Sequence, residues 1–213
     1  MGENIFQTVG IAVRTDIPSV PVRLNSELIA VGRKILYPAA VTVVSIYVPQ
    51  IQPNFASLFI RLLDQIDSPY IILGDFNAHH TLWGSNRNSR RGNEIVDIVE
   101  NRNAVVLNDG SITFARGRAR SAIDLTIVSH QLTSTIIWST ISEMCCSDHF
   151  PIQIGYSSCP PNTSRRRRWL KDRANWTAYE QSIEVALGRE QNHSSEEIEG
   201  IINICAFSPT GLR

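Results

Sequence analysis

Residues 70–85, YIILGDFNAHHTLWGS, constrain the fold of this chain more than any other stretch. The stretch opens with four apolar, partly β-branched residues, a run too short for a helix, which predicts a buried strand ended by Gly74. Asp75 and Asn77 follow two positions apart, and such residues point to the same side of an extended segment. A carboxylate and a carboxamide are therefore expected side by side at the rim of a sheet, although Gly-Asp-x-Asn is also ordinary turn chemistry.

Two later stretches place further acids near predicted strands. SAIDLT, residues 121–126, sets Asp124 inside an apolar strand pattern, and Ser147, Asp148 and His149 follow another candidate strand. Carboxylates hold a hard cation such as Mg²⁺ through oxygen, and the cation neutralises charge that develops on a phosphate. A histidine oriented by an acid can move a proton or hold a phosphoryl oxygen. Together these residues supply what metal-assisted attack on a phosphodiester needs.

In this order GDFN, SxIDLT and SDH resemble the endonuclease/exonuclease/phosphatase superfamily. The longer wording, GDFNAHHTLWGS followed by SAIDLTIVS, is most similar to the apurinic-type endonuclease domain of non-LTR retrotransposons, over about residues 9–156. The resemblance implies an α/β fold, a layered two-sheet sandwich flanked by helices with its site at the sheet edges. It also implies a divalent-metal-dependent DNA endonuclease that uses Mg²⁺ or Mn²⁺ and nicks target DNA for a downstream reverse transcriptase domain.

The resemblance assigns roles to four residues at the centre of the expected site. Asp75 would orient or deprotonate the attacking water, and Asn77 would hold that water or a phosphate oxygen. His149 would contact the scissile phosphate or protonate around it, and Asp124 would set the tautomer of that histidine. A buried acid paired with an arginine is the structural alternative for Asp124.

Five further residues complete the candidate site. By the same resemblance Asp148 would ligate the divalent ion and Tyr47 would contact a phosphate. A turn acid and a half-buried core tyrosine are the corresponding structural alternatives. Ser121 and Thr113 could donate hydrogen bonds to the DNA backbone. His80, like its loop neighbours His79 and Trp83, could touch DNA, although packed loop residues are equally expected.

Composition separates some classes of protein and leaves others open. The formal net charge is zero, but seven arginines and four acids lie between positions 87 and 120, and residues 165–168 are four consecutive arginines. This basic run could bind DNA or act as a nuclear signal, and a solvated linker is the alternative. The four cysteines lack CxxC spacing, which indicates reduced thiols in an intracellular protein and argues against zinc. No apolar stretch is long enough for a membrane span. We therefore expect an intracellular, nuclear protein.

The rest of the chain predicts alternating strands and helices up to residue 107 and strands thereafter. A strand pattern at 9–13, VGIAV, opens the series, and an amphipathic stripe from Phe55 to Ile66 predicts the first helix. Asn93 is expected to cap the second helix. A Pro-Pro boundary divides the chain into residues 1–158, the endonuclease-like domain, and 159–213, a basic linker with a helical tail. Further strands are expected at 20–24, 28–31, 41–48, 104–107, 113–116, 122–128, 135–142 and 150–156, and tail helices near 176–187 and 198–205.

Family members carry an asparagine and a metal-binding glutamate upstream of the strand that VGIAV matches, and this sequence has no residues there. We therefore expect a fold that lacks its first strands and an activity impaired by this truncation. One alternative is an inactive remnant that at most binds nucleic acid. Another is a phosphoesterase of the same superfamily that acts on a small phosphoester, but the retroelement-like wording favours DNA.

Overall fold

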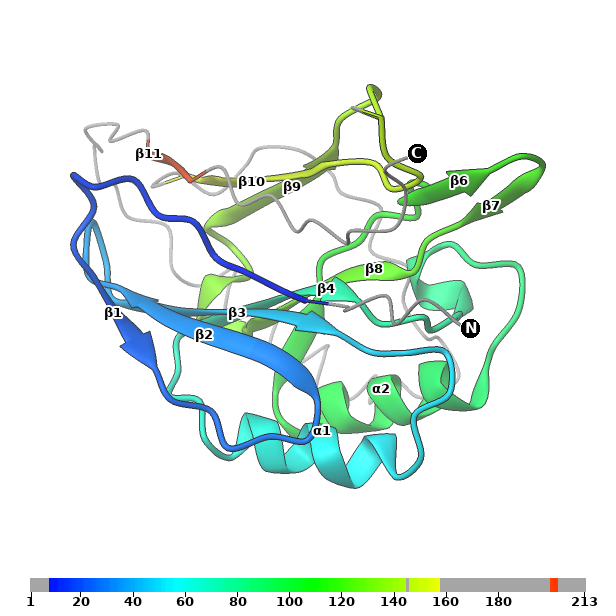
Figure 1. Ribbon diagram of the computed structural model, residues 1–213, viewed down its shortest axis with the longest axis horizontal. Helices are drawn as coiled ribbons and strands as arrows, with labels where there is room; N and C mark the ends of the chain where they lie inside the picture. The colour runs from blue at the N-terminus through cyan, green and yellow to red at the C-terminus, as the bar shows by residue number, and fades with distance from the viewer. Residues whose placement is uncertain (1–7, 145, 158–199, 203–213) are drawn as a thin grey trace, which may run out of the picture.

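A six-stranded mixed sheet forms the centre of the molecule in the computed structural model, which describes residues 8–144, 146–157 and 200–202. Only the neighbours β3 and β4 run parallel, and every other adjacent pair is antiparallel. β3 and β4 read as continuous apolar runs and are buried along their whole length, as expected for strands covered on both faces. The strand order is β1 (Ser19–Val22), β2 (Ile29–Ile35), β3 (Val41–Tyr47), β4 (Tyr70–Asp75), β8 (Asp124–Ser129) and β5 (Ala104–Val106) (Figure 1).

Two helices cover one face of this sheet (Figure 1). The helix α1 (Phe55–Leu63) connects the parallel strands β3 and β4, and α2 (Arg90–Asn101) precedes β5. Their apolar stripes pack on alternate residues of the sheet, among them Val44 and Ile72. The predicted cap of the second helix was wrong: Ser89, four residues before Asn93, is the N-cap, and its Oγ accepts a hydrogen bond from the Gly92 amide at 3.0 Å.

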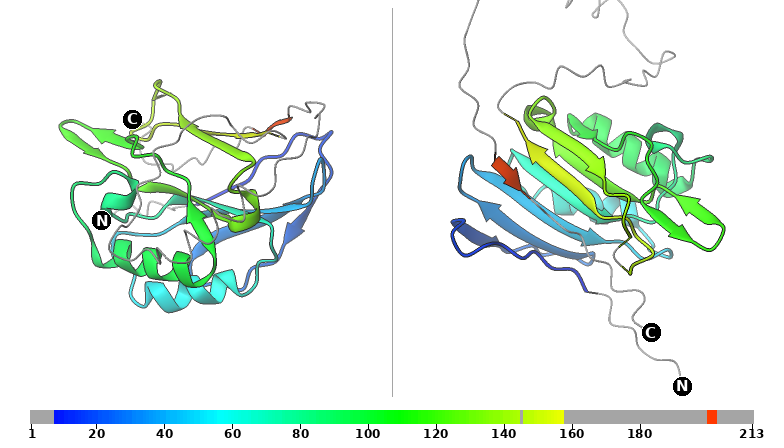
Figure 2. Two further views of the ribbon diagram at one scale, coloured as in Figure 1. Left: turned by 180° about the vertical axis from the view of Figure 1, so that it is seen from behind. Right: turned by 90° about the horizontal axis from the view of Figure 1, so that it is seen from above.

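A second, smaller sheet covers the other face. It contains β9 (Ile136–Thr140) and β10 (Ile152–Tyr156), with the short β11 (Gly200–Ile202) beside β10. Trp138 and Ile154 from this sheet pack against Val43, Ile71 and Val128 of the larger sheet. The molecule is thus a helix layer, a large sheet and a small sheet, which confirms the predicted two-sheet α/β sandwich (Figure 2).

A two-stranded hairpin projects beyond the end of the sandwich (Figures 1 and 2). It pairs β6 (Phe114–Arg116) with β7 (Ala119–Ser121) around a turn at Gly117, which has φ +56°. This turn ends the strand that was predicted at residues 113–116. The remaining short elements are the 3-10 turns η1 (Thr81–Trp83) and η2 (His130–Leu132).

Two sequence predictions of secondary structure were wrong. Residues 9–13 form no strand; their exposure alternates, and Ile11 and Val13 pack on the core between the sheets without a hydrogen-bonded partner strand. The second tail helix was expected over 198–205, but Gly200–Ile202 pairs with β10 as a strand, because the same apolar residues also suit a sheet edge. The first tail helix lies outside the described residues, and the division at residue 158 stays a prediction. No helix in the described part of the chain is both long and apolar enough to cross a membrane.

Candidate functional site

Three of the predicted site residues form one row across three neighbouring strands. Tyr47 at the end of β3 pairs with Asp75 at the end of β4, and Asp75 pairs with Asp124 at the start of β8. Directly paired residues project from the same face of a sheet. Their face is the one that packs on the small sheet, because Leu73 and Val128, which lie an even number of positions away, belong to the core between the sheets. The strand register alone therefore brings the tyrosine and both acids together.

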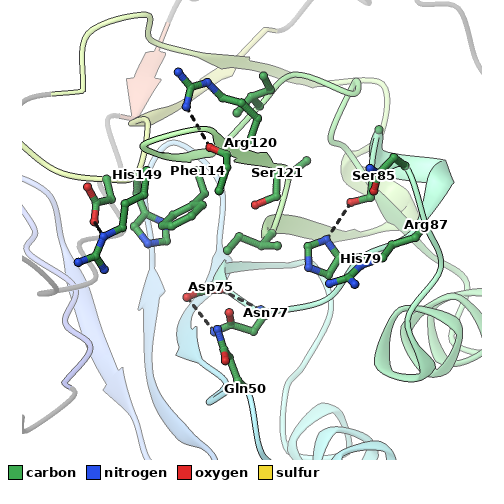
Figure 3. Close-up of a pocket in the computed structure, with 18 of the residues that line it drawn as sticks. Gln50, Asp75, Asn77, His79, Ser85, Arg87, Phe114, Arg120, Ser121 and His149 are labelled. Atoms are coloured by element: carbon green, nitrogen blue, oxygen red, sulfur yellow. Dashed lines mark hydrogen bonds and ion pairs between the residues drawn. The ribbon is translucent and has the colours of Figure 1, made fainter.

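Asp75 and Asn77 meet at the point where β4 opens into a loop. Asp75 Oδ1 accepts a hydrogen bond from the Asn77 amide at 2.8 Å, and its Oδ2 accepts one from Asn77 Nδ2 at 3.0 Å (Figure 3). Asn77 has φ +46°, a conformation that asparagine tolerates better than most residues. Burial and the neighbouring Asp124 raise the pKa of Asp75 to about 7, although the Asn77 amide, His149 and Arg91 oppose that rise. Asp75 can therefore exchange a proton near neutral pH.

Asp124 and His149 form a buried pair. His149 Nδ1 lies 2.9 Å from each carboxylate oxygen of Asp124, and both side chains are only 10% exposed. Burial lowers the pKa of His149, but the hydrogen bond to Asp124 and the charges of Asp124, Asp75 and Asp148 outweigh it, so the net shift is upward. Since an ionised carboxylate only accepts, Nδ1 carries a proton and Nε2 is the ring nitrogen left for the cleft. The ring of Phe114 packs edge-on against the imidazole at 5.0 Å.

Two buried side chains hold the segment that carries Asp124. Thr113 Oγ1 accepts hydrogen bonds from the amides of Ile123 and Asp124, each at 3.0 Å. On the other side Asn108 donates from Nδ2 to the Asp124 carbonyl at 2.8 Å and accepts from the Thr126 amide at 2.9 Å. Thr113 was predicted to contact DNA, but the structure buries it completely and does not bring it to the cleft.

The row of site residues opens onto a cleft of about 1030 Å³. One wall is the β6–β7 hairpin with Arg116, Arg120 and Ser121, and the opposite wall is the loop with His79, Ser85 and Arg87 (Figure 3). Among the predicted residues, the structure brings six to this cleft or its floor: Tyr47, Asp75, Asn77, Ser121, Asp148 and His149.

The adjacent loop histidines, His79 and His80, have different environments. His80, which was predicted to touch DNA, is buried; its Nδ1 accepts the Leu82 amide at 3.1 Å, and its ring packs on Trp83 at 5.1 Å. The structure does not bring it to the cleft. His79 lines the cleft instead, with its Nδ1 3.5 Å from Ser85 Oγ. Burial, and then the charge of Arg87, lower the pKa of His79, which favours the neutral imidazole.

Few carboxylate oxygens at the cleft are available as ligands for a hard cation. The Asp148 side chain is 32% exposed on the cleft, and its Oδ2 lies 3.6 Å from Arg116 Nε. The carboxylates of Asp75 and Asp124 are already bonded to Asn77 and His149. Within the described residues no three His, Cys, Asp or Glu side chains lie close enough together to hold a metal. One carboxylate fits Mg²⁺ only where water and substrate oxygens complete the shell.

Sequence reasoning missed Arg91 and Asn108. Arg91 donates to four backbone carbonyls beside the cleft, and a sequence carries no pattern for such partners. One signal was present: Arg90 and Arg91 stand in the first turn of a helix, where the macrodipole favours acids. Asn108 follows the short strand β5, and nothing in its neighbourhood distinguished it from a turn residue.

Comparison with known proteins identifies the family. A family model described as endonuclease-reverse transcriptase matches residues 41–153, from the first residue of β3 into β10. The chain belongs to the endonuclease-reverse transcriptase family. The matched residues contain the row of site residues and both loops that flank it, and the predicted resemblance to retrotransposon endonucleases is thereby confirmed.

Proteins of mobile elements are similar to this member of the family. The RNA-directed DNA polymerase from mobile element jockey of Drosophila melanogaster is 26% identical over 170 residues, which cover 78% of this chain and 18% of that protein. The probable RNA-directed DNA polymerase from transposon BS of the same species is 30% identical over 135 residues, 61% of this chain and 15% of that protein. The chain therefore spans less than a fifth of these relatives.

A solved structure shows the same fold. The endonuclease domain of TRAS1, a telomere-specific non-LTR retrotransposon, superposes with a TM-score of 0.61 and 22% identity, covering 68% of this chain and 71% of that chain.

Proposed function

We propose that this chain is the endonuclease domain of a non-LTR retroelement and cleaves phosphodiester bonds in DNA with the aid of Mg²⁺ or Mn²⁺. The observation that carries the proposal is that Asp75, with a pKa of about 7, and His149, which Asp124 holds from behind, both line one open cleft. A base and a positioned imidazole at the same floor are what hydrolysis of a phosphodiester requires.

Each residue takes one role in this proposal. The Asp75 carboxylate accepts a proton from the attacking water, which Asn77 helps to hold. The His149 imidazole, fixed through Nδ1 by Asp124, presents Nε2 to a phosphoryl oxygen or the leaving oxygen. Tyr47 lies beside Asp75 in the adjacent strand and contacts the phosphate from that side.

A divalent cation would be held by Asp148 together with water and phosphate oxygens, and it would supply neutralisation of the charge that develops on the phosphate. Arg116, Arg120 and Arg87 on the two walls suit the backbone of a polymer, because arginine binds phosphate oxygens through its planar fork. An open cleft with arginines on both walls favours nucleic acid over a small phosphoester. The relatives are polymerases of mobile elements, so we propose a reverse transcriptase domain as the partner and nuclear DNA as the substrate.

Plasmid nicking tests the proposal. Supercoiled DNA should become open circular in the presence of Mg²⁺ or Mn²⁺, chelation should stop the reaction, and His149→Ala and Asp75→Ala should each lose on the order of 10²-fold or more in rate. Unchanged nicking in either variant would remove that residue from the site.

A second candidate is a protein that binds nucleic acid without cleaving it. The observation that favours it is that the described residues bring no three metal-binding side chains together. Salt-dependent DNA binding without nicking across a Mg²⁺ and Mn²⁺ titration would support this candidate and overturn the first.

A further inference from the structure

The side chain of Arg91 joins two loops that leave the sheet beside the site. From the first turn of α2 its Nη1 donates to the carbonyls of Phe76 at 2.8 Å and Asn77 at 3.3 Å. Its Nη2 donates to the carbonyls of Pro49 at 2.7 Å and Gln50 at 2.9 Å. One loop continues from Asp75 and the other from Tyr47, so a single guanidinium spans the two segments that follow the paired strand ends.

The need for such a brace follows from where the strand ladder stops. β3 and β4 are paired up to Tyr47 and Asp75, and the Val48 amide makes one further bond to the Asp75 carbonyl at 2.8 Å. Beyond that point Asn77 Nδ2 reaches the Val48 carbonyl at 3.1 Å, and Arg91 supplies the next links. Within the described residues, the backbone hydrogen bonds between β3 and β4 stop before these links, so the two side chains are what holds the loops at a fixed separation.

The guanidinium is itself held in place. Its Cζ lies 5.4 Å from the centre of the Phe55 ring, a cation–π distance, and Arg91 does not line the cleft. A positively charged side chain in the first turn of a helix interacts unfavourably with the helix dipole. The stability of α2 therefore does not explain why an arginine stands at position 91. Lysine could not replace it, because an ammonium has three donors on one atom and no planar fork.

We propose that Arg91 is a positioning residue that fixes Asn77, and with it the Asp75 carboxylate, relative to Tyr47. It acts through backbone carbonyls and does not touch the substrate. This inference rests on the proposed nuclease function for its kinetic readout but not for its structural one.

The kinetic test compares Arg91→Ala and Arg91→Lys with Arg90→Ala in steady-state nicking of duplex DNA. Arg90 is the matched control, because its side chain is 93% exposed and, among the described residues, bonds only to Glu94 on its own helix. Both Arg91 variants should lose on the order of 10²-fold in kcat with little change in KM, since misplacement of about 1 Å has that effect. Arg90→Ala should match the wild-type chain.

Chemical rescue separates positioning from general stability. Guanidinium chloride at millimolar, non-denaturing concentration should restore kcat of Arg91→Ala by about tenfold or more, whereas methylammonium chloride at the same ionic strength should not. Full kcat in Arg91→Lys, a loss in KM alone, or equal rescue by both salts would overturn the proposal.

Amide hydrogen exchange tests the positioning role without any need for activity. If the wild-type chain does not nick DNA, the proposed function is wrong, but this measurement still decides whether Arg91 holds the two loops. The amides of Val48 and Asn77, which donate to the carbonyl and the carboxylate of Asp75, should exchange with deuterium faster in Arg91→Ala than in Val99→Ala. The latter variant loses a buried side chain of the same helix, eight positions after Arg91. Equal exchange in the two variants, compared at the same interval below their melting temperatures, would overturn the positioning role.

Discussion

Replacement of Thr113 by valine tests how the fold presents Asp124. The threonine is fully buried, and its Oγ1 accepts two backbone N–H groups, those of Ile123 and Asp124, at 3.0 Å each. Valine keeps the shape of the side chain but offers no acceptor. An unsatisfied buried donor costs about 1–3 kcal/mol, so loss of both bonds should lower the free energy of unfolding by about 2–6 kcal/mol.

Thermal unfolding followed by circular dichroism measures this effect. In a domain of this size each kcal/mol shifts Tm by about 2–4 °C, so Thr113→Val should melt roughly 4–24 °C lower. The valine variant should also lose nicking activity, because a displaced Asp124 no longer fixes the His149 ring, and about 1 Å of misplacement costs about 10²-fold in rate.

Thr113→Ser is the matched control, since serine keeps the hydroxyl and loses only a methyl group, worth about 1 kcal/mol of burial. Serine should therefore be the milder change, although valine is closer to threonine in volume. A valine variant as stable as the serine variant would refute the role of the hydroxyl as the acceptor that holds this segment.

Three further predictions concern acid–base behaviour and the cleft wall. Since burial and Asp124 raise the pKa of Asp75 to about 7, the nicking rate should rise as pH increases through about 7, and a flat profile between about pH 5 and 8 would exclude a base of this kind. Asp124→Asn should lower the pKa of His149 in an NMR titration of the metal-free protein. The Asp124–His149 pair stabilises the fold fully below about pH 6.5, the ordinary pKa of histidine, and this stabilisation is lost as pH rises through the raised pKa of His149 in the folded protein. The difference in unfolding free energy between the wild-type chain and Asp124→Asn should therefore shrink toward high pH. Gly84→Ala should lower the free energy of unfolding by about 1–3 kcal/mol, because Gly84 has φ +91° and a Cβ there would lie 2.5 Å from the backbone of Gly110. Gly117→Ala should lower it by less, because a Cβ at Gly117, where φ is +56°, would meet nothing within 4 Å. Thermal unfolding measures both.

The layered fold and the centre of the site could be predicted from sequence because they depend on strand ends. Short apolar runs at residues 41–48, 70–73 and 122–128 predicted strands, and the polar residues that end or begin them had to meet at a sheet edge. Asp75, Asp124 and His149 therefore fell where their motifs indicated.

The sequence did not predict the side chains whose hydrogen-bond partners are backbone groups. Of the neighbouring histidines, His80 caps the turn that follows it and His79 lines the cleft, and no periodicity distinguishes two adjacent loop residues. Thr113 reads as a surface hydroxyl in sequence, but the partners that bury it are amides ten and eleven positions away. The stretch 9–13 has the alternation of a strand, and alternation measures burial of one side rather than hydrogen bonding to a neighbour.

The row of Tyr47, Asp75 and Asp124 has a consequence for how this sequence can drift. Its geometry is set by the same strand pairing that aligns the apolar residues behind it, and a slip of one position would turn core residues outward together with the site. Mutations cannot shift the two acids relative to each other without first unfolding the sandwich. A chain with this sheet would therefore keep the two acids aligned for as long as it folds, and a mutation would destroy the row either by replacing one of these residues or by unfolding the whole sandwich.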